Sequence, residues 1–188
     1  MNDRPRYPWI VAEGIAEDIC NHLRPGCKRI KIAGSLRRQK PDVGDIEILY
    51  IPVMQEQPDP EDLFRSITVS LAGGRIDGLE RARILGRRLN SKGSEMYGPK
   101  NKLMVHIPSG IHVDLFTATE ENWFNYLVCR TGPKELNLRI CMAAIDRGWK
   151  WNPYGIGFSR GSEIRRMESE EAVFEFAGLP YRQPKDRI

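Results

Sequence analysis

Apolar residues in the first quarter of the chain change from helical spacing to strand spacing. Over residues 8–24 they recur every three or four positions, which predicts an amphipathic helix that ends at an Arg-Pro-Gly stretch. Residues 27–34 and 44–52 are short runs with Ile at alternate positions, which predict two strands. Between them, residues 36–38 predict the first turn of a short helix that follows a Gly-Ser pair.

The pattern is less regular in the middle of the chain. Residues 52–60 are polar and contain several prolines, which predicts a loop, and residues 61–72 carry Leu or Ile every fourth position, which predicts a helix. Residues 73–103 are rich in Gly and Arg and predict no clear element. Residues 102–118 form two β-rich runs around a Pro-Ser-Gly turn, which predicts a hairpin.

The last third of the chain is richer in helical patterns. Its predicted elements are three helices and one short strand with its turn, at residues 120–128, 133–147, 168–177 and 149–158. No segment of disordered composition separates this part from the rest. We therefore expect an α+β protein with two packed parts, a mixed β-sheet flanked by helices in residues 1–120 and a small α/β part in residues 121–188.

Composition narrows the function only slightly. The formal net charge of +4 permits nucleic-acid binding without indicating it. No apolar run approaches the roughly 18 to 20 residues of a membrane span, and the N-terminus lacks the apolar region of a secretory signal, so we expect a monomeric cytoplasmic protein. Cys20, His22 and Cys27 lie close together in sequence, but no second ligand pair follows, which favours free thiols over zinc.

Carboxylates interrupt two of the predicted strands. Asp45 and Glu47 alternate with Ile in one strand and therefore share a face, and Asp114 lies beside His112 on one face of the later strand. If the two strands are neighbours, three carboxylates converge and repel one another unless cations neutralise them. Oxygen ligands of this kind suit Mg²⁺ or Mn²⁺, and two such ions about 4 Å apart assist in-line phosphoryl displacement.

A Gly-Ser pair precedes these carboxylates. A glycine between a strand and a helix lets backbone N–H groups approach an anion, and Ser35 adds a hydroxyl donor. Arg38 adds a guanidinium suited to phosphate oxygens. Each feature alone is common in solvated surfaces. Their order along the chain is more specific and indicates a triphosphate held beside metal ions.

With these motifs the sequence resembles the nucleotidyltransferase superfamily, and within it the family X DNA polymerases. That group has Gly-Ser, then Asp-x-Asp or Asp-x-Glu about ten residues later, and a third Asp on a later strand; here Ser35 and Asp45 are ten positions apart. Residues 130–156, "RTGPKELNLRICMAAIDRGWKWNPYGI", resemble the family's thumb, and residues 167–187 resemble its closing segment. The resemblance implies a nucleotidyltransferase palm in residues 1–120 and a thumb in residues 121–188.

The resemblance also implies an activity and roles for matched residues. The activity would be addition of a dNTP to a primer 3′-hydroxyl on primer-template or gapped DNA, with two Mg²⁺ or Mn²⁺ ions, in DNA repair. The implied metal ligands and catalytic residues are Asp45, Glu47 and Asp114. The implied nucleotide-binding residues are Gly34, Ser35, Arg38 and Gly44 at the phosphates, Thr131 and Gly132 at the sugar, and Asn137 at the base. The expected DNA contacts are His112, Arg87, Arg88 and Arg130.

Departures from the family pattern leave alternatives open. Glu47 replaces the usual Asp, and Cys129 and Arg130 stand where the family has aromatic residues, which puts sugar discrimination in doubt. We expect a palm and thumb alone, because only about 30 residues precede the Gly-Ser pair. The alternatives are a template-independent or small-acceptor nucleotidyltransferase, and a DNA-binding relative without activity.

Overall fold

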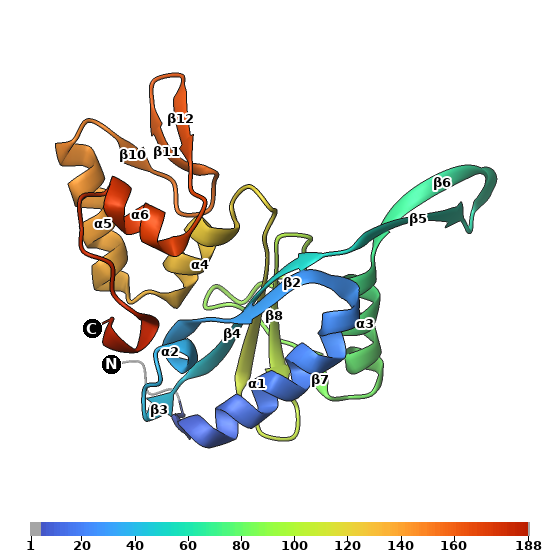
Figure 1. Ribbon diagram of the computed structural model, residues 1–188. Helices are drawn as coiled ribbons and strands as arrows, with labels where there is room; N and C mark the ends of the chain where they lie inside the picture. The colour runs from blue at the N-terminus through green and yellow to red at the C-terminus, as the bar shows by residue number, and fades with distance from the viewer. Residues whose placement is uncertain (1–4, 188) are drawn as a thin grey trace.

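A mixed five-stranded sheet forms the centre of the larger part of the molecule (Figure 1). The computed structural model describes residues 5–187, apart from the side chain of Leu63. The strand order is β2-β4-β9-β8-β7, with β4 and β9 parallel and the other neighbours antiparallel. These strands are β2 (Cys27–Ile32), β4 (Asp45–Pro52), β7 (Leu85–Arg87), β8 (Asn101–His106) and β9 (His112–Thr117).

Helices cover one face of this sheet. They are α1 (Trp9–Leu23) and α3 (Leu71–Arg81), with the 3-10 turn η1 (Arg24–Gly26) after α1. Ile46 and Ile48 of β4 point into the core that these helices share with Val113 and Leu115 of β9. The short helix α2 (Gly34–Arg37) joins β2 to a small two-stranded sheet formed by β1 (Tyr7–Pro8) and β3 (Asp42–Val43). The predicted helix, strands and hairpin of this part are therefore confirmed.

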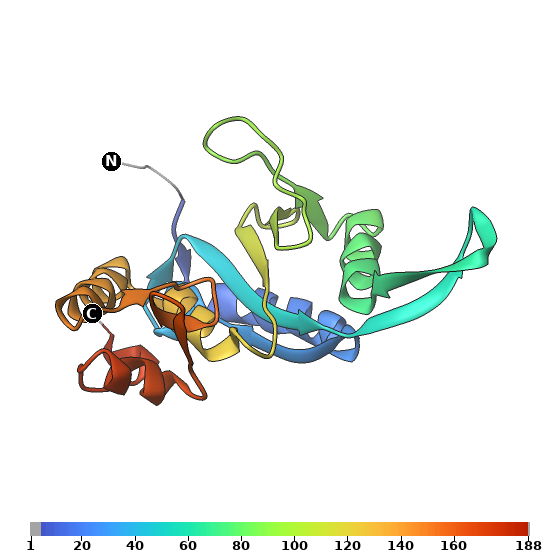
Figure 2. The ribbon, with the colours of Figure 1, turned by 90° about the horizontal axis from the view of Figure 1, so that it is seen from above.

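Two predictions in the middle of the chain were wrong. The predicted loop contains β5 (Met54–Asp59), and most of the predicted helix 61–72 is β6 (Asp62–Ser70), with which β5 pairs antiparallel. The two strands form an arm that extends away from the sheet (Figures 1 and 2). Leu or Ile at every fourth position fits an exposed strand as well as a helix, and β-branched residues at 67–69 favour the strand.

The C-terminal part packs its own elements beside the sheet. Its elements are α4 (Trp123–Thr131), α5 (Lys134–Asp146), β10 (Lys150–Trp151), β11 (Gly157–Arg160), β12 (Glu163–Arg166), α6 (Glu170–Phe176) and the 3-10 turn η2 (Pro184–Asp186). The last strand, β12, completes a three-stranded sheet with β10 and β11 and was not predicted. The three predicted helices are present.

Helix α4 connects the two parts. Trp123 and Leu127 pack against Leu49 and Phe116 on the sheet face opposite α1, while Val128 enters the core formed by α5, α6 and the small sheet. The fold is thus α+β with a mixed sheet, as the sequence predicts. The boundary at residues 120 and 121 stays a prediction, because α4 contributes to both cores.

Candidate active site

The three carboxylates of the predicted site lie on two neighbouring parallel strands. In the register of β4 and β9, Glu47 is opposite Asp114 and Asp45 is opposite His112. Because side chains alternate along a strand, all of these face away from the core that holds Ile46 and Val113. The tertiary pairing therefore brings together carboxylates that are about 70 residues apart in sequence.

Glu47 lies in the least solvated position of the three. Its Oε2 atom is buried without a hydrogen-bond partner among residues 5–187. Burial raises the pKa of Glu47 to about 8, with Asp45 and Asp114 adding to the rise and Arg130 opposing it. Gly34 packs against this side chain, since a Cβ at Gly34 would meet three carbon atoms of Glu47 at 3.4 Å. Gly34 also has a φ of 64°, which an L-residue adopts only with strain.

Arg38, which directly follows α2, connects that helix to the end of α4. Its Nη1 donates to the backbone oxygen of Thr131, and a Cβ at Gly132 would lie 3.3 Å from the same Nη1. Burial lowers the pKa of Arg38, while Glu47 and Glu135 counteract this effect. Glycine at position 132, with a φ of 62°, thus allows the guanidinium to approach the start of α5 closely.

A pocket of about 450 Å³ lies between the carboxylate face of the sheet and the α4–α5 turn. It brings together most of the predicted nucleotide and metal residues. Those lining it are Gly34, Ser35, Arg38, Asp45, Glu47, Arg130, Gly132 and Asn137. The sequence analysis assigned no role to four other lining residues, Pro133, Lys134, Glu135 and Tyr154. Of these four, Tyr154 alone is part of a motif noted in the sequence, the Asn-x-Tyr-Gly segment of the thumb resemblance.

Several polar atoms in this pocket are buried without a hydrogen-bond partner in the described chain. Those that line it are Arg38 Nε, Glu47 Oε2, Arg130 Nε and Asn137 Oδ1. Buried polar groups in proteins are almost always paired. Two donors and two acceptors left unpaired in one pocket therefore indicate a polar ligand with both negatively charged and hydrogen-bonding groups.

Arg130 is held over a group of aromatic rings. Its guanidinium carbon lies 3.6 Å from the ring centre of Phe116 and 5.3 Å from those of Tyr126 and Tyr154. Burial lowers the pKa of Arg130, but Tyr126 and Glu47 outweigh this effect and raise it. The arginine that replaces an aromatic residue of the family pattern is thus a fixed cation beside Glu47.

Six predicted site residues lie outside the pocket lining, namely Gly44, Arg87, Arg88, His112, Asp114 and Thr131. Gly44 and His112 line a separate hollow of about 70 Å³. Thr131 is buried, and its Oγ1 accepts a hydrogen bond from Arg37 Nη1 at 2.7 Å.

Asp114 faces a guanidinium. Arg88 Nη2 donates to its Oδ1, and both side chains are largely buried. Burial raises the pKa of Asp114, and Arg88 opposes the rise. Arg87, the other predicted DNA contact on β7, is exposed and pairs with Glu80 at 2.8 Å and Glu95 at 3.8 Å. The two neighbouring arginines therefore lie in different surroundings.

The carboxylate oxygens are of the kind that Mg²⁺ and Mn²⁺ bind, and the unpaired, buried Oε2 of Glu47 fits a cation. Within residues 5–187, however, no three His, Cys, Asp or Glu side chains are gathered into a complete metal-binding group. In the structure Asp114 pairs with Arg88. The types of donor fit such ions, whereas the arrangement of the side chains is not that of a complete metal site.

A buried ion network, which the sequence analysis missed, joins the two parts beneath the pocket. Arg37 of α2 donates to both oxygens of Glu170 in α6, at 2.5 and 3.1 Å. Arg187, only 1% exposed, donates to the same carboxylate at 2.8 Å. Burial alone would raise the pKa of Glu170, but the two arginines hold it below its usual value. Arg37 stands beside Arg38 in the sequence, but nothing there points to its partner Glu170, 133 positions away.

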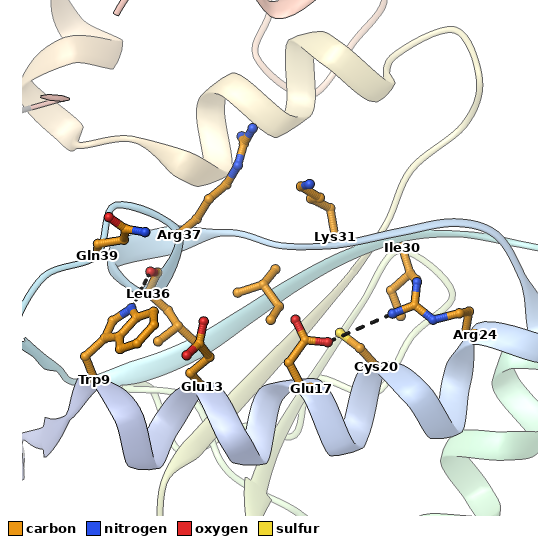
Figure 3. Close-up of a pocket in the computed structure, with 11 residues that line it drawn as sticks. Trp9, Glu13, Glu17, Cys20, Arg24, Ile30, Lys31, Leu36, Arg37 and Gln39 are labelled. Carbon is orange, nitrogen blue, oxygen red and sulfur yellow. Dashed lines mark hydrogen bonds and ion pairs between the residues drawn. The ribbon is translucent and has the colours of Figure 1, made fainter. Parts of the chain in front are cut away.

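A second hollow of about 270 Å³ lies between α1 and β2 (Figure 3). Glu13 and Glu17 project from α1 toward β2, on which Lys31 lies, and Arg24 reaches Glu17 at 4.0 Å. None of the buried, unpaired side-chain atoms found in the described chain belongs to this hollow. We call it the α1–β2 groove; no predicted site residue lines it.

Among the described residues, no helix is long and apolar enough to span a membrane.

Comparison with known proteins agrees with this arrangement. The family model for the DNA polymerase beta thumb matches residues 126–188. Repair DNA polymerase X of African swine fever virus, isolate Pig/Kenya/KEN-50/1950, is 27% identical over 163 residues, which cover 86% of this chain and 82% of the viral protein. The DNA polymerase/3′-5′ exonuclease PolX of Bacillus subtilis strain 168 is 28% identical over 184 residues, which are 97% of this chain and 28% of the bacterial protein. The chain is therefore similar to DNA polymerases named polymerase X, and its residues 126–188 are similar to the polymerase beta thumb.

Proposed function

We propose that the chain is a DNA-directed DNA polymerase that adds dNMP to a primer 3′-hydroxyl by two-metal nucleotidyl transfer, in the repair of short gaps. The observation that carries this proposal is the set of unpaired polar atoms in the pocket beside Asp45 and Glu47. A dNTP offers phosphate oxygens for the arginine N–H groups, and metal ions bound with it offer positive charge for the carboxylates.

The phosphate end of the nucleotide lies, in this proposal, at the start of α2. Gly34 leaves room for the backbone to approach an anion, and Ser35 and Arg38 line the same pocket. Gly44 and Thr131 support this end from outside the lining, through the β3–β4 turn and through the bond to Arg37. Catalysis then consists of positioning and charge neutralisation.

Asp45, Glu47 and Asp114 would hold the metal ions. Bound there, divalent ions supply positive charge at the attacking 3′-hydroxyl and at the phosphates. The ion pair with Arg88 keeps Asp114 neutralised when it is not bound to an ion. Arg88 would then be released toward DNA, and Arg87, His112 and Arg130 remain candidates for DNA contact.

Primer extension on one-nucleotide gapped DNA with magnesium tests the proposal. We expect one dNMP, complementary to the template, to be added, and no addition by the Asp45→Ala variant. A single-stranded primer without template is the matched control. Equal extension of that primer would instead favour the template-independent enzyme, and DNA binding without extension would favour the inactive relative.

A further inference from the structure

Arg130 is held in a fixed place in the wall of the pocket. It lies in the last turn of α4, and the backbone on both sides of it is bonded to other elements. Asn137 Nδ2 donates to the oxygen of Cys129 at 2.9 Å, which turns the NH₂ end of that amide toward α4. Arg38 donates to the oxygen of Thr131. The position of Arg130 therefore depends on α2 and α5 as well as on its own helix.

The guanidinium of Arg130 has no carboxylate partner of its own. Within residues 5–187 no ion pair shorter than 4 Å joins it to an aspartate or glutamate, and its Nε is buried without a hydrogen-bond partner. Arg37 and Arg88, which are half-buried like Arg130, each donate to a carboxylate. The aromatic rings around Arg130 offset part of the cost of burying a cation but carry no negative charge. An anionic group of a ligand would supply what is missing.

We infer that Arg130 binds a phosphate group of the nucleotide, as a second guanidinium in addition to Arg38, and does not contact DNA. The inference rests on the proposed function, because it takes a nucleoside triphosphate as the ligand. Both arginines line the same pocket, and ionised phosphates accept hydrogen bonds from guanidinium groups. An aromatic residue, as in the family pattern, would supply no charge at this position.

The surroundings of Arg130 also differ from those of an arginine that can reach DNA. Its guanidinium lies inside the pocket against Phe116 of the sheet, whereas Arg87 is exposed. The inference therefore moves Arg130 from the predicted DNA contacts to the nucleotide site.

Binding of inorganic tripolyphosphate and of dATP separates the phosphates from the nucleoside. Arg130→Met removes the cation and keeps an apolar side chain against the rings. Calorimetric titration with magnesium and without DNA should show that this variant binds both ligands about tenfold more weakly. Weaker binding of dATP alone would place Arg130 at the nucleoside and overturn the inference, as would unchanged binding of both ligands.

Binding to gapped DNA at several salt concentrations tests the second half of the inference. The slope of log affinity against log salt should be the same in Arg130→Met and in the unmodified protein. A lost contact to a DNA phosphate would instead reduce the slope by about 0.9 and overturn the inference. Arg139→Met is the matched control, because it removes an exposed arginine of α5 outside the pocket, and it should leave the binding of dATP and tripolyphosphate unchanged.

Arg130→Lys decides the matter if thermal unfolding shows that Arg130→Met does not fold. Lysine keeps the charge but lacks the Nε donor and the planar group, so both ligands should bind about threefold more weakly. Unchanged affinity in Arg130→Lys would then overturn the inference. If the unmodified protein binds neither dATP nor tripolyphosphate, the proposed function fails together with the inference.

Discussion

The pocket between the two parts and the α1–β2 groove contain similar residue types but differ in how their polar atoms are paired. Both hold arginine, glutamate and cysteine side chains. In the groove, Trp9 Nε1 donates to Leu36 O at 3.0 Å and Arg24 lies 4.0 Å from Glu17, whose side chain is exposed. In the pocket, Arg38, Glu47, Arg130 and Asn137 each keep a buried atom without a partner.

The difference indicates which hollow is built for a ligand. An exposed charge is solvated by water and costs little, whereas a buried one persists only where something else compensates for it. Volume and residue composition alone would not separate the two hollows. The following predictions compare a change in the pocket, or in the contacts around it, with a matched change elsewhere.

The largest expected effect follows from neutralising one glutamate in each hollow. Glu47→Gln should lower primer extension about a thousandfold, or roughly 4 kcal/mol, because it removes the charge that faces the proposed metal ions. Glu17→Gln in the groove should leave the rate of primer extension within about twofold of the unmodified protein, because Glu17 forms only an exposed ion pair with Arg24. Steady-state extension rates measure both, and equal losses would contradict the distinction between the hollows.

The ion network beneath the pocket should contribute to stability in a pH-dependent way. Glu170→Gln should lower the free energy of unfolding by about 3 kcal/mol at pH 7, because it leaves Arg187 buried without a charge partner. The pKa of Glu170 is lowered in the folded state, so its stabilisation is present at neutral pH and is lost as the pH falls below about 4.

Thermal or urea unfolding between pH 3 and pH 7 measures this effect. The control is Glu163→Gln, which removes an exposed carboxylate paired with Arg160 and Arg165 and should leave the stability nearly unchanged. A constant difference between unmodified protein and Glu170→Gln over the whole pH range would rule out the ion network as its cause.

Two glycine substitutions compare the pocket with an exposed position of α1 that lines neither hollow. Gly132→Ala should weaken dNTP binding about tenfold, because its φ of 62° strains an alanine and the new methyl group meets Arg38 Nη1 at 3.3 Å. Gly14→Ala on α1 meets nothing within 4 Å and should stabilise the helix by about 0.5–1 kcal/mol with unchanged dNTP affinity. Nucleotide titration and thermal unfolding of both variants test this, and unchanged binding in Gly132→Ala would remove Arg38 from the phosphate site.

The smallest expected effect concerns Arg87, the last residue of β7, and Arg88, which follows it. Arg87 is exposed, so Arg87→Gln should reduce the slope of log DNA affinity against log salt by about one unit. Arg88 pairs with Asp114, so Arg88→Gln should reduce extension more than it changes the slope. Binding to gapped DNA at several salt concentrations measures the slopes, and an equal loss of slope in both variants would place Arg88 on the DNA as well.

Local patterns were sufficient for much of the fold. The spacing of apolar residues predicted α1, β4 and the β8–β9 hairpin, because each of these elements buries apolar side chains at regular positions, and Pro133 indicated the start of α5. The arm formed by β5 and β6 was missed because its described side chains are exposed or half-buried, so no buried face imposes a strand period on the sequence.

The alternation that places Asp45 and Glu47 on one side of a strand, and the Gly-Ser turn ahead of them, could be predicted from the sequence because both depend on neighbouring residues. The contact of Asp114 with Arg88, the two arginines around Glu170 and the orientation of the Asn137 amide became visible only in the folded chain. These arrangements depend on which distant polar atoms are paired when the two parts pack together. No local period in the sequence records that pairing.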